Sequence, residues 1–106
     1  MTWFRSFFDE DNVWQYFEVG DDGWAKRQVD LRADDAQALT AATLDEVLHL
    51  RDHADLAAMQ RYERQFGVLA EASLDGWRDD PRAEEITQTE FEEVWTAARS
   101  ALSGSG

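Results

Sequence analysis

Glu46, His49 and His53 are the residues whose types and spacing first suggest chemistry in this sequence. Intervals of three and four residues place the three side chains on one side of a continuous helix. Two imidazoles and a carboxylate form a donor set that suits a divalent metal. The apolar residues of the same segment lie on the opposite side, so we expect the histidines to face water. A working metal site needs outer hydrogen bonds and limited solvent access, and we therefore predict no metal and no cofactor.

Acidic residues occur in adjacent pairs along the whole chain, at positions 9–10, 21–22, 34–35, 45–46, 79–80, 84–85 and 92–93. General acid–base catalysis needs a carboxyl group that is desolvated beside another polar group. Pairs in predicted turns are hydrated instead, and those near positions 9 and 21 lack the ligand spacing of a calcium loop. The sequence also has no cysteine, no Ser-His-Asp arrangement and no glycine-rich phosphate loop. We predict that the protein is not an enzyme.

The charge of the chain favours recognition over catalysis. Its 23 acidic and ten basic residues give a formal net charge of −13. Direct binding to nucleic acid or to an anionic membrane is disfavoured, whereas a basic protein would be attracted. Aromatic side chains beside the acids could supply the anchors of such an interface. The predicted partner-binding residues are Trp14, Tyr16, Asp21, Asp22, Glu84 and Glu85.

The leading functional hypothesis is a non-enzymatic acidic protein–protein interaction module, such as an inhibitor or immunity-type partner of a basic protein. Two alternatives stay open. The aromatic sheet face or the Glu46 side could bind a small ligand or a metal, or exposed aromatics could make the chain a self-associating assembly subunit. The acidic surface could also serve solubility alone, with Trp14 and Tyr16 in the core.

Strands and tight turns must position these residues. Residues 13–19 and 24–31 alternate between two faces with the period of a strand, and Gly20-Asp21-Asp22-Gly23 between them predicts a hairpin turn. Residues 2–8 are aromatic and predict a first strand that pairs with residues 13–19. The result is a three-stranded antiparallel meander with aromatic side chains on both faces.

The middle of the chain predicts two helices. Residues 33–42 are interpreted as a connector, with a short helix over 36–39 that Asp34-Asp35 caps. Thr43 and Glu46 match a capping box, a break is expected near Asp52, and a second helix runs from about residue 54 to Phe66, ended by Gly67. Residues 68–73 are either a strand or an extended connection, and 78–85 form an acidic loop around Pro81.

The C-terminal helix is the best defined of the helices in the sequence. Thr87 fits an N-cap with Glu90 three residues later, and Ile86 with Phe91 makes a hydrophobic staple. One apolar stripe follows, comprising Phe91, Val94, Trp95, Ala98, Ala101 and Leu102. The tripeptide Asp22-Gly23-Trp24 recurs at Asp75-Gly76-Trp77, which we interpret as two unrelated turns that each lead into a buried tryptophan.

Two motifs carry a resemblance to known proteins. Asp22-Gly23-Trp24-x-x-Arg27-x-Val29 and Ile86-Thr87-x-x-Glu90-Phe91-Glu92-x-x-Trp95 resemble a group of small, acidic, uncharacterised bacterial domains of actinobacterial type. These have an N-terminal hairpin and a C-terminal Glu-Phe-Glu helix. The resemblance implies an α+β fold, and it implies no activity and no functional residue.

Together these patterns predict one α+β domain over residues 1–102. A small, mainly antiparallel sheet built on the meander is packed by two central helices and the C-terminal helix. Residues 103–106 are expected to form a flexible Ser/Gly tail that could derive from the expression vector. The chain lacks cysteine and a membrane-spanning apolar run, and we expect a cytoplasmic protein.

Overall fold

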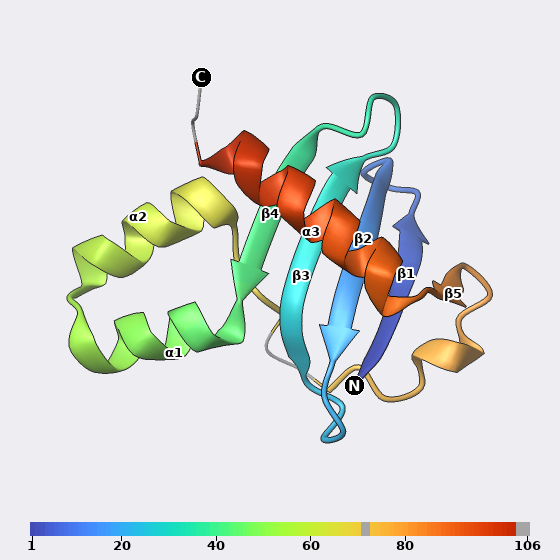
Figure 1. The fold of residues 1–106 in the computed structure, drawn as a ribbon, viewed down its shortest axis with the longest axis horizontal. Coiled ribbons are helices and arrows are strands. Elements are labelled where there is room, and N and C mark those ends of the chain that lie inside the picture. The colour runs from blue at the N-terminus through green and yellow to red at the C-terminus, as the bar shows by residue number, and fades with distance from the viewer. Residues whose placement is uncertain (71–72, 104–106) are drawn as a thin grey trace.

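The computed structural model describes residues 1–70 and 73–103, which form a five-stranded antiparallel sheet and three α-helices. In chain order the elements are β1 (Thr2–Phe8), β2 (Val13–Val19), β3 (Ala25–Arg32), β4 (Ala38–Thr43), α1 (Leu44–His53), α2 (Leu56–Phe66), the 3-10 turn η1 (Trp77–Asp79), β5 (Ala83–Glu85) and α3 (Gln88–Leu102). The strand order is β4-β3-β2-β1-β5 (Figure 1). The predicted α+β fold with an N-terminal meander is confirmed. Residues 104–106 of the predicted tail lie outside the described residues.

The meander forms because its residues alternate as strands do. β1 pairs with β2 from Thr2 opposite Val19 to Phe8 opposite Val13, and β2 pairs with β3. A register shift at Val19 places this residue opposite Ala25. Such a shift changes the side of the sheet to which the side chains around the turn point.

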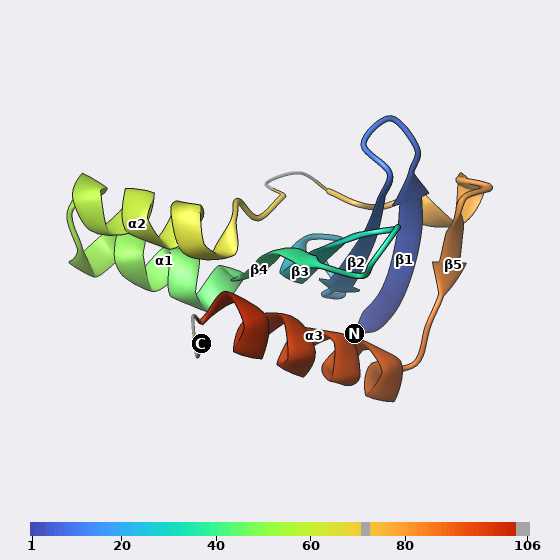
Figure 2. The same cartoon turned by 90° about the horizontal axis from the view of Figure 1, so that it is seen from above.

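The two faces of the sheet bury different side chains. One row of paired residues comprises Phe4, Phe17, Gln28 and Ala42, and the next row, on the opposite face, comprises Arg5, Tyr16, Val29 and Ala41. α3 covers the second row, with Ala98 and Val94 packed against Val29. Residues 67–70 and 73–77 cover the first row, with Leu69 and Trp77 against Phe4 and Phe17. Figure 2 shows α3 and this connection on opposite sides of the sheet.

α3 forms as its sequence predicts. The amide of Glu90 donates to the Thr87 side chain at 3.1 Å, which satisfies one of the free amides of the first turn. Phe91 and Ala98 are buried, and Ile86 before the helix is buried as well. The interior stripe therefore follows the predicted positions, except that Ala101 is exposed.

α1 and α2 lie side by side beyond β4 (Figures 1 and 2). The predicted break is confirmed, because α1 ends at His53 and α2 begins after Asp55, whose side chain accepts from the Ala58 amide at 2.9 Å. Gly67 ends α2 with a φ of 87°, a conformation that favours glycine.

The predicted capping box at α1 is wrong. Thr43 occupies the N-cap position, but its side chain makes no capping hydrogen bond. Glu46 instead accepts hydrogen bonds from Tyr62 of α2 and Arg99 of α3. Two tertiary partners thus replace the local one.

Two strands were not predicted. Residues 38–43 form β4 rather than a connector with a short helix, because pairing with β3 buries Ala41 and Ala42 completely. Residues 83–85 form β5 within the predicted acidic loop, paired with β1. Residues 68–73 were expected to form a strand or an extended connection. Those of them that the structure describes belong to the connection between α2 and η1, in which Ser73 makes an isolated bridge with Trp24. Residues 71–72 lie outside the described residues. Within the described part of the chain, no helix combines the length and apolar content needed to cross a bilayer.

Candidate functional site

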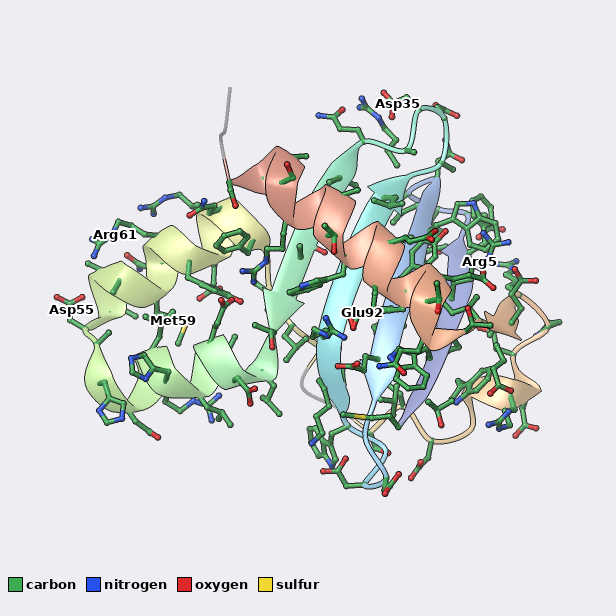
Figure 3. The ribbon with its side chains drawn as sticks, viewed as in Figure 1. Arg5, Asp35, Asp55, Met59, Arg61 and Glu92 are labelled. Carbon is green, nitrogen blue, oxygen red and sulfur yellow. The ribbon has the colours of Figure 1, made fainter. Side chains whose placement is uncertain are left out.

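Three of the six predicted partner-binding residues meet at Arg5. The register of the sheet sets Tyr16 and Glu84 on either side of Arg5. The Arg5 guanidinium donates to the Tyr16 hydroxyl at 3.3 Å and pairs with Glu84. Its carbon lies 4.2 Å from the centre of the Trp14 ring, a cation–π contact. Figure 3 shows Arg5 to one side of α3.

Trp14 and Tyr16 are therefore neither core residues nor free anchors. Both are half-buried on the face that carries α3. Tyr16 packs against the cluster beneath α3, and Trp14 lies 5.1 Å from the Phe7 ring. We name Arg5, Phe7, Trp14, Tyr16 and Glu84 the Arg5 cluster. It presents an aromatic surface edged by one carboxylate.

The other three predicted residues lie elsewhere. Glu85 is the cross-strand neighbour of Phe4, so it lies on the other face of the sheet from Arg5. Its carboxylate pairs with Arg78 at 3.3 Å. Asp21 and Asp22 occupy the turn between β2 and β3. Asp21 is fully exposed and meets the terminal ammonium at 3.3 Å. The predicted set is thus divided among three places, namely the two faces of the sheet near β1 and β5 and the β2–β3 turn.

Asp22 has a tryptophan neighbour, Trp24, that is not among the predicted partner-binding residues. Its side chain accepts from the Trp24 amide at 3.0 Å and from Lys26 Nζ at 3.1 Å, and these bonds lower the pKa of the Asp22 carboxyl. The Trp24 ring is 43% exposed. It lines a groove of about 420 Å³ whose other lining residues are Asp22, Ala25, Lys26, Leu44, Leu48, Arg51 and Ala70.

The two Asp-Gly-Trp turns pack against each other. The amide of Leu74 donates to the Gly23 carbonyl at 2.7 Å. Trp77 is half-buried and stacks on Phe4 with ring centres 4.3 Å apart. The expectation that both turns lead into a buried tryptophan is wrong for Trp24, because the neighbouring Ala25 takes the interior position.

Glu46, His49 and His53 do not converge on one point. The Glu46 oxygens accept from Tyr62 at 2.8 Å and from Arg99 at 3.1 Å. The two histidines are exposed, with ring centres 4.8 Å apart. Burial raises the pKa of Tyr62 to about 12, and its bond to Glu46 acts in the same direction. In residues 1–70 and 73–103, no group of three acidic, histidine or cysteine side chains is arranged to hold a metal.

A second buried network surrounds Arg27. Its guanidinium makes two hydrogen bonds to Glu18, at 2.8 and 2.7 Å, and two to Glu92 of α3, at 2.7 and 2.8 Å. Trp3 Nε1 also donates to Glu18 at 2.9 Å. Burial opposes the charge on Glu18, but the bonds from Arg27 and Trp3 outweigh it and lower its pKa.

Aromatic rings of α3 pack against Arg27 and also against Arg99, the partner of Glu46. The Arg27 guanidinium carbon lies 4.9 Å from the Phe91 ring centre and 5.0 Å from that of Trp95. Arg99 lies on the same Trp95 ring at 4.6 Å. The carboxylates here are occupied by strong partners, and the arrangement joins the sheet to α3. These charge-assisted hydrogen bonds therefore stabilise the packing of α3 on the sheet.

Comparison of the chain with protein-family models, with curated proteins and with solved structures finds no match. The resemblance to small acidic bacterial domains therefore remains an expectation.

Proposed function

We propose that this protein is a non-enzymatic interaction module that binds a basic protein through its acidic surface, as an inhibitor or immunity-type partner does, in the cytoplasm. The carrying observation is how the fold distributes charge. Its basic side chains are largely engaged with carboxylates of the same chain. The surplus of acidic side chains faces solvent.

Among the residues that the structure describes, ion pairs engage at least seven of the chain's ten basic residues, including Arg5, Lys26, Arg27, Arg32, Arg78, Arg82 and Arg99. Apart from the half-buried Asp30, the described acidic side chains outside these pairs are exposed in turns and on outer helix faces, among them Glu10, Asp11, Asp34, Asp45 and Glu93. The labelled Asp35 and Asp55 lie at separate extremes of the molecule (Figure 3). A negative field on many sides steers a basic partner toward the protein.

Aromatic side chains beside carboxylates support the same proposal. Trp14 and Tyr16 lie next to Glu84 through Arg5, and Trp24 lies next to Asp22. Interfaces derive much of their affinity from a few aromatic and arginine residues, while the surrounding charges set approach and orientation. The Arg5 cluster and the Trp24 turn each combine these elements.

Affinity capture from a lysate of the source organism tests the proposal. The immobilised proteins are the wild type, a variant with Asp21→Asn, Asp22→Asn, Glu84→Gln and Glu85→Gln, and a control with Glu10→Gln, Asp11→Asn, Asp34→Asn and Glu93→Gln. Both variants remove the same amount of charge. We expect a basic protein to be retained at low salt and released at high salt.

The first variant should bind this protein about tenfold more weakly, since four exposed pairs at a few tenths of a kcal/mol each sum to about 1.4 kcal/mol. The control should bind nearly as the wild type does. Equal losses in both variants would contradict the assignment of these four residues. Capture that is indifferent to salt and to both variants would contradict the electrostatic basis of the proposal.

A further inference from the structure

Two histidines lie side by side on the exposed face of α1. His49 and His53 are four residues apart in this helix, and both side chains are exposed. Their ring centres are 4.8 Å apart, and the ring planes are tilted by 41°. The break between α1 and α2 falls after His53, and the Ala54 amide donates to the Leu50 carbonyl at 3.0 Å, which closes the last turn. The helix therefore holds both histidines at a fixed spacing.

The spacing of the two rings suits one shared metal ion. A metal-bound imidazole nitrogen lies about 2.0 Å from Zn²⁺, which puts the ring centre about 3.2 Å from the ion. Two such rings at a tetrahedral angle have centres about 5.2 Å apart, and two at a right angle have centres about 4.5 Å apart. The observed 4.8 Å lies between these values. Because both side chains are exposed, rotation about χ2 can turn one nitrogen of each ring toward the same ion.

The pair offers two donors, in contrast to the three-residue face that the spacing of Glu46, His49 and His53 suggests. The Glu46 carboxylate is engaged by Tyr62 and Arg99 instead. Among the residues that the structure describes, no third acidic or histidine side chain is placed to complete a metal-binding group. Neutral imidazole suits Ni²⁺, Cu²⁺ and Zn²⁺, whereas Ca²⁺ and Mg²⁺ prefer oxygen ligands. The chemistry of the pair is therefore that of a bidentate nitrogen ligand for a late transition metal.

Charges around the pair favour a cation. Asp45 precedes His49 by one helical turn and Asp52 follows it by three residues, and both carboxylates are exposed. Arg51 is two residues from His49 and from His53, which places it on another side of the helix. The net charge of the chain is −13, so its field draws divalent cations toward the surface.

We propose that His49 and His53 together chelate one divalent transition-metal ion, Ni²⁺, Cu²⁺ or Zn²⁺, through one nitrogen of each ring, with water in its remaining positions. This site is independent of the binding of a basic protein. It differs from the site of a resident metal cofactor, which needs outer hydrogen bonds and limited solvent access. An ion held by two exposed side chains exchanges with solvent.

Calorimetric titration of the untagged chain with Zn²⁺, beside NMR of the histidine ring protons, tests the proposal. We expect one ion per chain and the largest shifts at the rings of His49 and His53. Mg²⁺ at the same concentration should leave these signals in place. Equal shifts with Mg²⁺ would overturn the proposal, because carboxylates would then be the ligands.

Variants assign the binding to the pair. His49→Ala and His53→Ala should each weaken Zn²⁺ binding about tenfold or more, because the remaining ring loses a second donor held beside the ion. Asp52→Asn is the control, since it removes a nearby charge and keeps both rings, and it should weaken binding by no more than about threefold. All three side chains are exposed, so the variants should keep the fold, which circular dichroism checks.

Three results would overturn the proposal. The first is a wild type that binds no Zn²⁺, and the second is binding that either histidine variant keeps unchanged. The third is an Asp52→Asn variant that loses as much affinity as the histidine variants, since the ion would then be held by acidic side chains.

Discussion

Replacement of Arg27 by methionine tests whether the buried ion network holds α3 on the sheet. The Arg27 side chain is 18% exposed and that of Glu18 is 10% exposed, whereas Glu92 is 42% exposed. Methionine preserves the apolar stem between Phe91 and Trp95 but removes all four hydrogen bonds to the carboxylates. Glu18 then keeps only the bond from Trp3 among these partners.

The size of the loss follows from burial. Removal of one partner of a buried pair costs about 3–5 kcal/mol, because the other charge stays buried without compensation. Glu92 is exposed enough to regain water, so we expect the lower end, about 3 kcal/mol. For a chain of this length that loss lowers Tm by roughly 13 °C.

Urea and thermal denaturation measure this loss, with Arg78→Met as the matched control. The Arg78–Glu85 pair has side chains 61% and 59% exposed, so its removal should cost less than about 0.5 kcal/mol. Adding Glu18→Gln to Arg27→Met should restore much of the stability, because glutamine carries no buried charge and still accepts from Trp3.

The loss should also depend on pH. The hydrogen bonds from Arg27 and Trp3 hold the pKa of Glu18 below its ordinary value of 4.5, so the pair stabilises fully above that value. Its contribution disappears as pH falls through the folded-state pKa, and the two proteins should converge there. An Arg27→Met variant as stable as Arg78→Met at neutral pH would refute the assignment of Arg27 as the fastening of α3.

Three further predictions concern single side chains. Burial raises the pKa of Asp30 above its ordinary value of 3.8, so its ionised form costs stability. Asp30→Asn should therefore raise Tm at neutral pH but not below pH 3.8, and an equal gain at both pH values would contradict this. Gly67→Ala should destabilise more than Gly76→Ala in urea denaturation, because both have positive φ but, of the two, only at Gly67 does a Cβ meet a neighbour, Thr40 Cβ at 2.7 Å; equal losses would show that strain alone matters. Thr87→Ala should cost about 1 kcal/mol in the same assay, since it removes the cap of α3, and an unchanged midpoint would show that the cap is dispensable.

The elements that the sequence predicts are those with strong local patterns. Alternation over residues 13–19 and the Gly20–Gly23 turn specify the central hairpin, and Thr87 with Phe91 specifies the start of α3. The sequence pattern does not predict β4, because its alanines are poor strand formers and only pairing with β3 makes the segment a strand. β5 is three residues long and two of them are acidic, so it has no pattern of its own.

The candidate sites depend on contacts between distant residues, which local patterns do not contain. Glu46 fits a capping box by spacing, but Arg99, which lies 53 residues away, takes its carboxylate. Trp14 was predicted to be an anchor because it lies on the strand face opposite Val13 and Phe17, yet Arg5 and Phe7 partly cover it. Trp24 could have been selected from its place between an acidic turn and a strand, but its exposure depends on the register shift at Val19.

The salt dependence of partner binding tests the central proposal most directly. Once a basic protein has been captured, its affinity for the wild type should be measured over a series of salt concentrations, beside the variant with Asp21, Asp22, Glu84 and Glu85 neutralised. We predict that the affinity falls steadily as salt rises and that the variant shows a shallower dependence, because it has fewer charges to screen. Affinity that is the same at low and high salt, for both proteins, would contradict an acidic surface as the basis of binding.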